Sequence, residues 1–340
     1  MKERNTSIDM FRLAAVALVI IQHYRLFNMN TDAAVWSGFF CRIAVPFFFM
    51  VSGYFSWKAE PGPRSAYLKK QLATIGKILA VSAVVIIAFN QFFIDYNIKW
   101  RIPYIKRLIL FNEPKFLFGH AHMWYMLALI YVLAVGLLIE KLRLHKWAYR
   151  LAPLLLLINV ILDFVLFNTK LVRRACYTRN WLLDGLPFFY IGQFIHRYEG
   201  RIRQLITRGR SLILLAVSAL CLGIEGGLLL RFGQHVDRTL YIFLPLLGIA
   251  VFLVLLSFPN IGRGSFIVRY ARDASMIMYV IHHMVEEIIK ITALKLWGIR
   301  MFQHSTIRFC LIFLFSWAIG MVYAVIINQK RDRKKSRPVT

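Results

Sequence analysis

Ionisable side chains interrupt an otherwise apolar run near the start of the chain. The stretch IDMFRLAAVALVIIQHYRLF, residues 8–27, contains Asp9, Arg12 and His23. On a helix, Arg12 and His23 share one face about 16 Å apart along the axis, and Asp9 can pair with Arg12 one turn away. An imidazole can act as a general base, and a guanidinium binds anions. The stretch therefore predicts proton transfer and anion binding within a helix.

Further apolar stretches contain Arg42, His122, Glu225 and His282. Counting about 1.5 Å per residue from the expected helix ends puts them and His23 at a similar depth. Charged groups in lipid must be paired or hydrated, so we expect one shared polar cavity. It would hold two general bases, a carboxylate and an anion stabiliser, which are the parts of an acyl-transfer site. A proton-coupled transporter uses the same parts, and the residues alone leave both readings open.

Other polar residues near the expected helix ends are interpreted as a rim. His283, Glu286 and Glu287 form its solvated part, and Asp163, Asp184 and Asp237 are rim groups expected to pair with nearby arginines. No histidine pattern of the HExxH kind is present, so the sequence predicts no metal site. The four cysteines are widely separated and predict no disulfide framework.

The composition indicates the elements that carry these residues. The chain has 340 residues, of which 59% are hydrophobic, and its mean hydropathy is +0.58. We expect an all-α integral membrane protein with about ten transmembrane helices, since each crossing needs about 20 apolar residues. The expected spans are about 8–27, 39–57, 72–94, 122–140, 148–167, 183–198, 211–230, 239–256, 266–289 and 308–328. The net charge of +27 lies in short clusters between these spans, so we expect no nucleic-acid partner.

The distribution of lysine and arginine predicts the orientation. The connections on the side of both chain ends are richer in basic residues, so both termini are expected in the cytoplasm. Residues 1–328 are expected to form the transmembrane domain, and 329–340 a basic cytoplasmic tail that binds lipid headgroups. The connection 95–121 alternates basic and apolar residues and predicts an interfacial amphipathic helix. Pro46 predicts a kink, and Ser52-Gly53 predicts close helix packing.

Segments along nearly the whole chain resemble one family. The first span with Asp9, Arg12 and His23, the wording CRIAVPFFFMVSGYF and the HMWYMLALI run with Trp124 resemble the acyltransferase-3 family of bacterial membrane proteins. TRNWLLDGLPFFYIGQFI, with Arg179 and Asn180, and SMIMYVIHH, with Tyr279, resemble two later segments in the same order.

The resemblance implies transfer of an acyl group, usually acetyl, from cytoplasmic acyl-CoA to a hydroxyl of an envelope glycan or exported small molecule. It implies a multi-pass protein of the bacterial cytoplasmic membrane, with acetyl-CoA as donor substrate and no bound cofactor. Arg12 would hold the CoA end, His23 would be the base or acyl carrier, and Arg42 would stabilise negative charge. His282 and Trp124 would shape the acceptor side, which we extend to His122, Arg179, Asn180 and Tyr279.

Two features complicate this reading. The family often has an Arg-x-x-Arg pair at the start of the third span, where this chain has Lys69 and Lys70, which bind phosphate without the bidentate fork. The run IEGGLLLRFGQHVDRTLYIFLP, with Glu225 and Asp237, is similar to the membrane half of the membrane-bound serine racemases of vancomycin-resistance clusters. A serine-transport component without the racemase domain is therefore the alternative function.

Overall fold

The computed structural model describes residues 4–24, 26–27, 32–58, 61–94, 98, 101–119, 121–169, 175–232, 238–293 and 305–335. The described residues are helical, with no strand among them, which confirms the all-α class. The chain divides into two compact units. The first unit comprises residues 1–44 and 251–340, and the second comprises residues 45–250.

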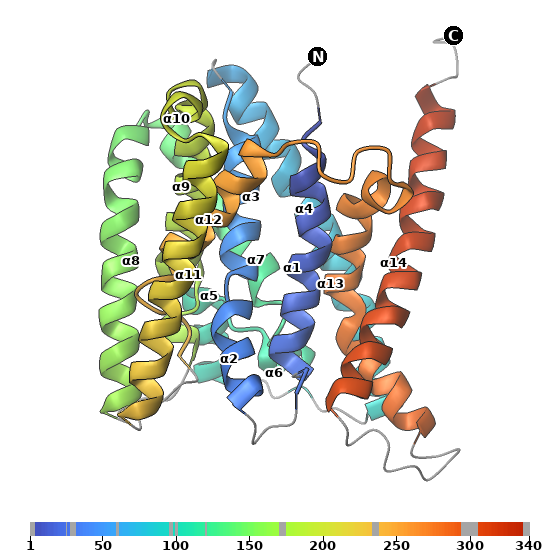
Figure 1. The fold of residues 1–340 in the computed structure, drawn as a ribbon. Helices are drawn as coiled ribbons and strands as arrows, with labels where there is room; N and C mark the ends of the chain where they lie inside the picture. Colours follow the sequence, from blue (N-terminus) through green and yellow to red (C-terminus); the bar gives the residue numbers. More distant parts are fainter. Residues whose placement is uncertain are drawn as a thin grey trace. The chain divides into compact units, whose positions relative to one another are not determined.

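The first unit is built around three long helices. They are α1 (Thr6–Tyr24), α13 (Phe266–Thr292) and α14 (Ser305–Lys335), and α2 (Asp32–Cys41) packs beside α1. Helix α13 packs against both α1 and α14 (Figure 1). Tyr270, Ala274, Met321 and Ala324 form a buried apolar core between α13 and α14.

Hydrogen bonds show that α1 and α14 run in opposite directions. Arg308, near the start of α14, donates to the carbonyl of Tyr24 at the end of α1 (3.1 Å). Thr306 likewise donates to the carbonyl of Leu26 (2.7 Å). The start of α1 and the end of α14 therefore lie on the same side of the first unit (Figure 1). The cytoplasmic location of that side stays a prediction.

The second unit contains the remaining helices. They are α3 (Ala44–Ser56), α4 (Pro61–Phe89) with the π-helical turn η1 (Asn90–Ile94), α5 (Ile102–Phe111), α6 (Lys115–Phe118), α7 (Trp124–Lys141), α8 (His145–Asn168), η2 (Ala175–Tyr177), η3 (Trp181–Gly185), α9 (Leu186–Arg197), α10 (Glu199–Leu205), α11 (Arg208–Arg231) and α12 (Leu244–Ser257), which continues into the first unit. Helix α4 packs against α7, and α8 packs against α9.

Two glycines bring α3 and α9 into close contact. A Cβ atom on Gly53 would lie 1.8 Å from the carbonyl oxygen of Phe189, and one on Gly192 would lie 2.0 Å from that of Met50. At each glycine the backbone of the opposite helix therefore comes very close. Small residues allow such close approach between membrane helices. The predicted packing role of Gly53 is confirmed.

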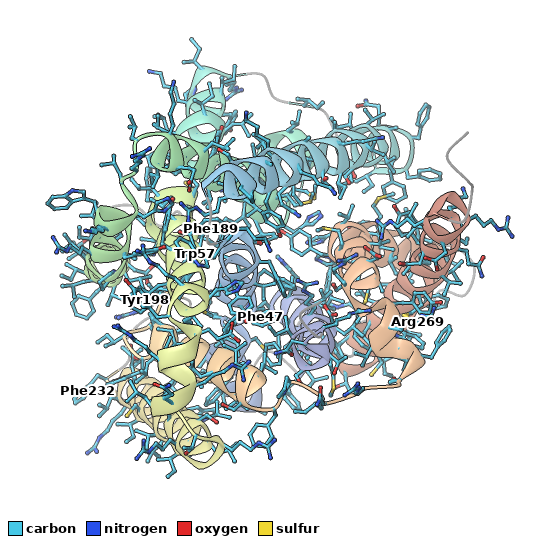
Figure 2. All side chains as sticks on the ribbon, turned by 90° about the horizontal axis from the view of Figure 1, so that it is seen from above. Phe47, Trp57, Phe189, Tyr198, Phe232 and Arg269 are labelled. Carbon is cyan, nitrogen blue, oxygen red and sulfur yellow. The ribbon has the colours of Figure 1, made fainter. Side chains whose placement is uncertain are left out.

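Among the described residues, seven helical segments are long and apolar enough to cross a membrane. They are Thr6–Tyr24, Val35–Ser56, Gly62–Ile94, Trp124–Lys141, His145–Leu166, Arg208–Arg231 and Thr306–Arg333. The other expected spans coincide with α9, α12 and α13, which are short or carry charged residues at both ends. Many apolar side chains face outward, as Phe232 does with 69% exposure after α11 (Figure 2). This pattern suits a multi-pass membrane protein surrounded by lipid.

The second expected span is not one continuous helix. Helix α2 ends at Cys41, Arg42 and Ile43 form a turn, and α3 begins at Ala44. Pro46 lies in the first turn of α3, where a missing N–H removes no helical hydrogen bond. The helix is thus interrupted just before the proline, and the kink at Pro46 stays a prediction.

Residues 102–111 of the long connection form α5, so the predicted helix is present. Its location at a membrane interface stays a prediction.

Candidate functional site

Three histidines meet in the first unit. His23 lies in the last turn of α1, and His282 and His283 are neighbours on α13. The ring centroids are 5.5 Å apart for His23 and His282, 4.8 Å for His23 and His283, and 4.6 Å for His282 and His283. We call these residues the histidine cluster. The predicted proximity of His23 and His282 is confirmed, although they are far apart in the sequence.

His283 is buried, with 8% exposure, and His282 is fully buried. The prediction that His283 belongs to a solvated rim is wrong because α13 packs against α1 at this level. Neighbouring residues on a helix point about 100° apart. Both imidazoles can therefore face α1 only where α13 contacts that helix. His23 is partly exposed and can be reached from outside the cluster.

Tyr24 supports the cluster from α1. Its buried hydroxyl is hydrogen-bonded to Nδ1 of His283, and the Glu286 carboxylate lies close enough to interact with it. The Arg308 guanidinium lies 5.7 Å from the centre of the Tyr24 ring. The cluster therefore has a second layer of one hydroxyl, one carboxylate and one guanidinium.

The backbone sets the tautomer of His282. Nδ1 of His282 lies 2.8 Å from the carbonyl oxygen of Tyr279. A carbonyl only accepts, so Nδ1 carries the proton and Nε2 keeps its lone pair. Tyr279 is buried, with its ring centroid 6.1 Å from that of His282, so this predicted site residue lies beside the cluster.

Arg42 belongs to the same unit as the cluster. It lies in the turn between α2 and α3, directly after Cys41. Gln22, the neighbour of His23, donates its side-chain amide to the carbonyl of Cys41 (2.5 Å). The backbone at Arg42 is thereby anchored to the last turn of α1. Its predicted role as an anion stabiliser is compatible with this position.

Asp9 binds two arginines at the other end of α1. Its carboxylate oxygens lie 2.5 Å from Nε of Arg4 and 3.1 Å from Nη1 of Arg12. Arg4 also donates to the carbonyls of Val268 and Arg269 on α13 (3.2 and 3.1 Å). The predicted Asp9–Arg12 pair is confirmed, and it also helps to join α1 to α13.

In the second unit, Lys69 and Lys70 are exposed on α4, available to an anionic ligand. Arg64 on the same helix is buried instead, in an ion pair with Glu140 that the sequence did not predict.

Glu225 has a clear structural task. Its two carboxylate oxygens accept hydrogen bonds from the backbone N–H groups of Ile242 and Phe243 (2.8 and 3.0 Å). These residues immediately precede α12, where backbone donors lack helical partners. Glu225 thus caps the entrance to α12, which explains a carboxylate in an apolar helix. Its predicted catalytic role is not needed to account for its position.

His122 and Trp124 lie buried at the start of α7, and the Arg179 guanidinium is 5.2 Å from the centre of the Trp124 ring.

Asp163 and Asp184 are also buried, so their interpretation as rim groups is wrong. Asp163 accepts from the Thr239 hydroxyl (2.5 Å), which replaces part of its lost hydration. Asp237 lies outside the described residues.

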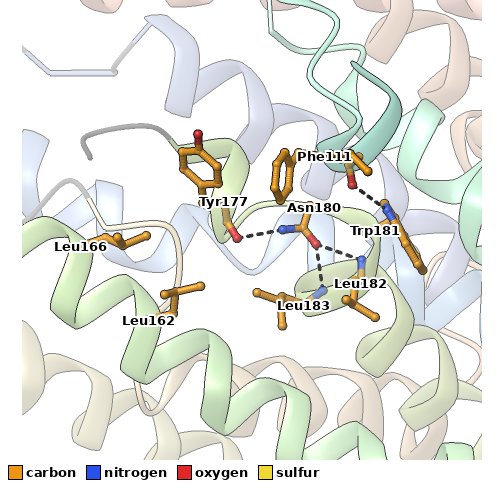
Figure 3. A pocket seen from close by; sticks show the side chains of 9 residues that line it. Phe111, Leu162, Leu166, Tyr177, Asn180, Trp181, Leu182 and Leu183 are labelled. Carbon is orange, nitrogen blue, oxygen red and sulfur yellow. Dashed lines mark hydrogen bonds between the residues drawn. The ribbon is translucent and has the colours of Figure 1, made fainter. Parts of the chain in front are cut away.

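Asn180 acts as a helix cap. Its side-chain oxygen accepts from the backbone N–H groups of Leu182 and Leu183 (3.0 Å each), and its amide donates to the carbonyl of Tyr177 (2.9 Å) (Figure 3). It lines an apolar cavity of about 370 Å³. The other lining residues are Leu110, Phe111, Leu162, Leu166, Tyr177, Trp181, Leu182 and Leu183. None of the residues predicted to be catalytic, which are His23, Arg42, Glu225 and His282, is among them.

The sequence also missed the buried asparagines that join the connections. Asn112 accepts from the N–H of Trp181 (2.9 Å) and donates to the carbonyl of Trp124 (3.1 Å), and Asn90 donates to the carbonyl of Phe118 (2.7 Å). An asparagine beside an apolar run was the available signal, since a buried amide needs several partners.

The site predicted from the sequence thus divides between the units. His23, Arg42 and His282 lie in the first unit, whereas Glu225 and His122 lie in the second. A single cavity that contains all of them stays a prediction. Of the described residues, the histidine cluster is the group whose ligand atoms could hold a metal ion, because they all lie within 4.8 Å of one another.

Curated relatives of this chain are racemases. An amino-acid racemase of Enterococcus faecalis is 24% identical over an alignment of 363 positions, which covers 99% of this chain and 48% of that protein. A serine/alanine racemase of Enterococcus gallinarum is 27% identical over 278 residues, which cover 74% of this chain and 37% of that protein. The chain therefore spans about half the length, or less, of these relatives. No solved structure matches it.

The acyltransferase domain of the acyltransferase-3 family matches residues 5–327, nearly the whole chain. The match includes α1 with His23, the Arg42 turn and the His282-His283 pair of α13. With its apolar helices and its histidine cluster, this chain belongs to the acyltransferase-3 family of membrane proteins.

Proposed function

We propose that this protein is an O-acyltransferase of the bacterial cytoplasmic membrane. It moves an acyl group, acetyl in the simplest case, from cytoplasmic acyl-CoA to a hydroxyl of an envelope or exported glycan. The observation that carries the proposal is the pairing of His23 with His282, whose ring centroids are 5.5 Å apart, in a member of an acyltransferase family.

His23 is the general base in this proposal. It takes the proton of the acceptor hydroxyl while the hydroxyl oxygen attacks the thioester carbonyl carbon. The carbon–sulfur bond then breaks, and CoA leaves as a thiolate that receives the proton. The products are an ester and free CoA, so no oxidant or cofactor is required. General-base catalysis of this kind contributes about 10²- to 10⁴-fold.

Basic residues supply the supporting roles in this proposal. Arg42, anchored beside the last turn of α1, stabilises the oxyanion of the tetrahedral intermediate. Arg12, held by Asp9 near the start of α1, and the exposed Lys69 and Lys70 bind the phosphates of CoA. His122, Trp124, Arg179 and Tyr279 serve the acceptor side.

The test uses purified protein in lipid vesicles with acetyl-labelled acetyl-CoA and a crude pool of envelope glycans. We expect CoA release and label transfer by the wild type, and a loss of at least about 10²-fold in His23→Ala. His196→Gln is the matched control, because His196 stacks on Tyr54 in the second unit and has no role in the proposed chemistry. Full turnover by a folded His23→Ala variant would remove His23 from the mechanism.

A serine-transport component is the second candidate. It is favoured by the alignment of 99% of this chain with 48% of an amino-acid racemase, since a racemase domain can lie on the part of that protein that the alignment does not cover. Vesicles that take up labelled serine and release no CoA would favour this function. CoA release without serine uptake would favour acyl transfer.

A further inference from the structure

The histidine cluster has the ring spacing of a metal site. Zinc–nitrogen bonds of about 2.0–2.1 Å at tetrahedral angles put ligand nitrogens about 3.3 Å apart and imidazole centres about 5 Å apart. The observed centroid separations of His23, His282 and His283 are 4.6, 4.8 and 5.5 Å. The ligand atoms lie within 4.8 Å of one another, so side-chain rotations that move them by about 1 Å complete the geometry.

The hydrogen bond of His282 presents the correct nitrogen. Histidines that bind metals nearly always donate their other ring N–H to a carbonyl, a carboxylate or water. Nδ1 of His282 donates to the carbonyl oxygen of Tyr279 at 2.8 Å. Nε2 of this fully buried residue is therefore the nitrogen that carries the lone pair.

His283 is oriented by a hydrogen bond from another helix. The Tyr24 hydroxyl of α1 is hydrogen-bonded to Nδ1 of His283. When Nδ1–H donates to the hydroxyl oxygen, Nε2 carries the lone pair, as in His282. A polar partner at Nδ1 is the support that metal-binding histidines usually have.

We propose that His23, His282 and His283 form a binding site for a divalent transition-metal ion, with Zn²⁺ as the ion best suited to it. Three neutral imidazoles suit zinc, and a three-histidine site leaves the fourth position open to water or a substrate oxygen. The bound ion occupies His23, so it competes with proton transfer and inhibits acylation. This inhibition rests on the proposed function, whereas metal binding does not.

Binding is tested on the full chain, purified in detergent with an affinity tag that contains no histidine. Co²⁺ is titrated while the visible absorption of tetrahedral cobalt is followed, and Zn²⁺ is added to displace it. We expect one ion per chain in the wild type and none in His282→Gln or His283→Gln. His196→Gln is the matched control and keeps the site. Absence of cobalt bands in the wild type, or equal bands in all variants, would overturn the proposal.

Two measurements keep the proposal testable if a histidine variant does not fold. Tyr24→Phe removes only the hydroxyl that orients His283, and we expect the affinity for Zn²⁺ to fall about 10- to 100-fold. In the wild type, Zn²⁺ should raise the midpoint of thermal unfolding, and Mg²⁺ should not, because an ion that binds the folded state stabilises it. Equal effects of Zn²⁺ and Mg²⁺ would contradict the site.

Activity separates the two proposals. With acetyl-CoA and acceptor, one equivalent of Zn²⁺ should abolish CoA release, and a chelator should restore it. CoA release that Zn²⁺ leaves unchanged overturns the proposed inhibition and keeps the proposed function. Cobalt bands that depend on His282 and His283, without any CoA release, support the metal site and count against the acyltransferase.

Discussion

At the scale of single residues, hydrogen bonds from neighbouring groups orient the imidazoles of His282 and His283. The carbonyl of Tyr279 determines which nitrogen of His282 carries its proton, and the Tyr24 hydroxyl is hydrogen-bonded to the same nitrogen of His283. Both histidines therefore direct Nε2 away from these partners. A proton shuttle and a metal ion each need such a nitrogen, so the same arrangement serves both proposals.

A buried ion pair in the second unit serves stability instead. Arg64 of α4 donates through Nε to both carboxylate oxygens of Glu140 at 3.0 Å. Nε2 of His145, at the start of α8, lies 2.7 Å from the same carboxylate. The Arg64 guanidinium also lies 4.5 Å from the centre of the Trp57 ring. Glu140 thereby joins α4, α7 and α8.

We expect Glu140→Gln to destabilise the protein by about 3–5 kcal/mol, because it leaves the buried Arg64 charge without its partner. Equilibrium unfolding in detergent measures the change in free energy. Arg331→Gln is the control: it breaks the exposed pair of Arg331 with Asp273 and should cost less than about 1 kcal/mol. Equal losses in the two variants would show that burial does not decide the effect.

At the scale of helices, the contact of α3 with α9 decides how the second unit packs. Gly53 and Gly192 each lie against a backbone carbonyl of the opposite helix. An added Cβ atom cannot be accommodated by a side-chain rotation, because the neighbouring atoms belong to the backbone.

Gly53→Ala should therefore lower the unfolding free energy by about 1–3 kcal/mol or more, through overpacking. The measurements are the unfolding midpoint and the yield of monodisperse protein. Gly223→Ala, on α11 with open space around the added Cβ, is the matched control. It should be neutral or stabilise by up to about 1 kcal/mol, because alanine favours helix more than glycine. A stable Gly53→Ala variant would contradict the close contact.

At the scale of the whole molecule, the chain ends lie in the first unit, and the second unit is inserted between them. The histidine cluster belongs entirely to the first unit, which is built from both ends of the sequence. A truncation at either end would therefore remove part of the cluster's surroundings.

The predicted orientation can be tested in intact cells with a membrane-impermeant maleimide. In a background without the native cysteines, Lys115→Cys should be labelled and Lys146→Cys should be protected until the cells are opened. Both side chains are exposed, in connections predicted to lie on opposite sides of the membrane. The reverse pattern would invert the topology and move His23 to the cytoplasmic half.

Much of the helical architecture and part of the site followed from the sequence. The apolar runs predicted the long helices, the Asp9–Arg12 pair formed as their spacing indicated, and His23 and His282 meet. The predictions failed where burial depended on distant partners. His283 lies inside α13 and Asp184 lies in η3, and only the packing of other helices excludes solvent from them.

The sequence by itself determined the helical membrane class, because hydropathy and helical period are properties of neighbouring residues. Its motifs carried the resemblance to the family. Tertiary structure decided which polar residues serve chemistry and which serve the fold. Glu225 caps the entrance to α12, and Asn180 caps η3. His283 is hydrogen-bonded to Tyr24, the neighbour of His23, although Tyr24 and His283 are 259 positions apart in the sequence. A hydrogen bond across that separation exists only when α1 and α13 pack together, and no local pattern encodes that contact.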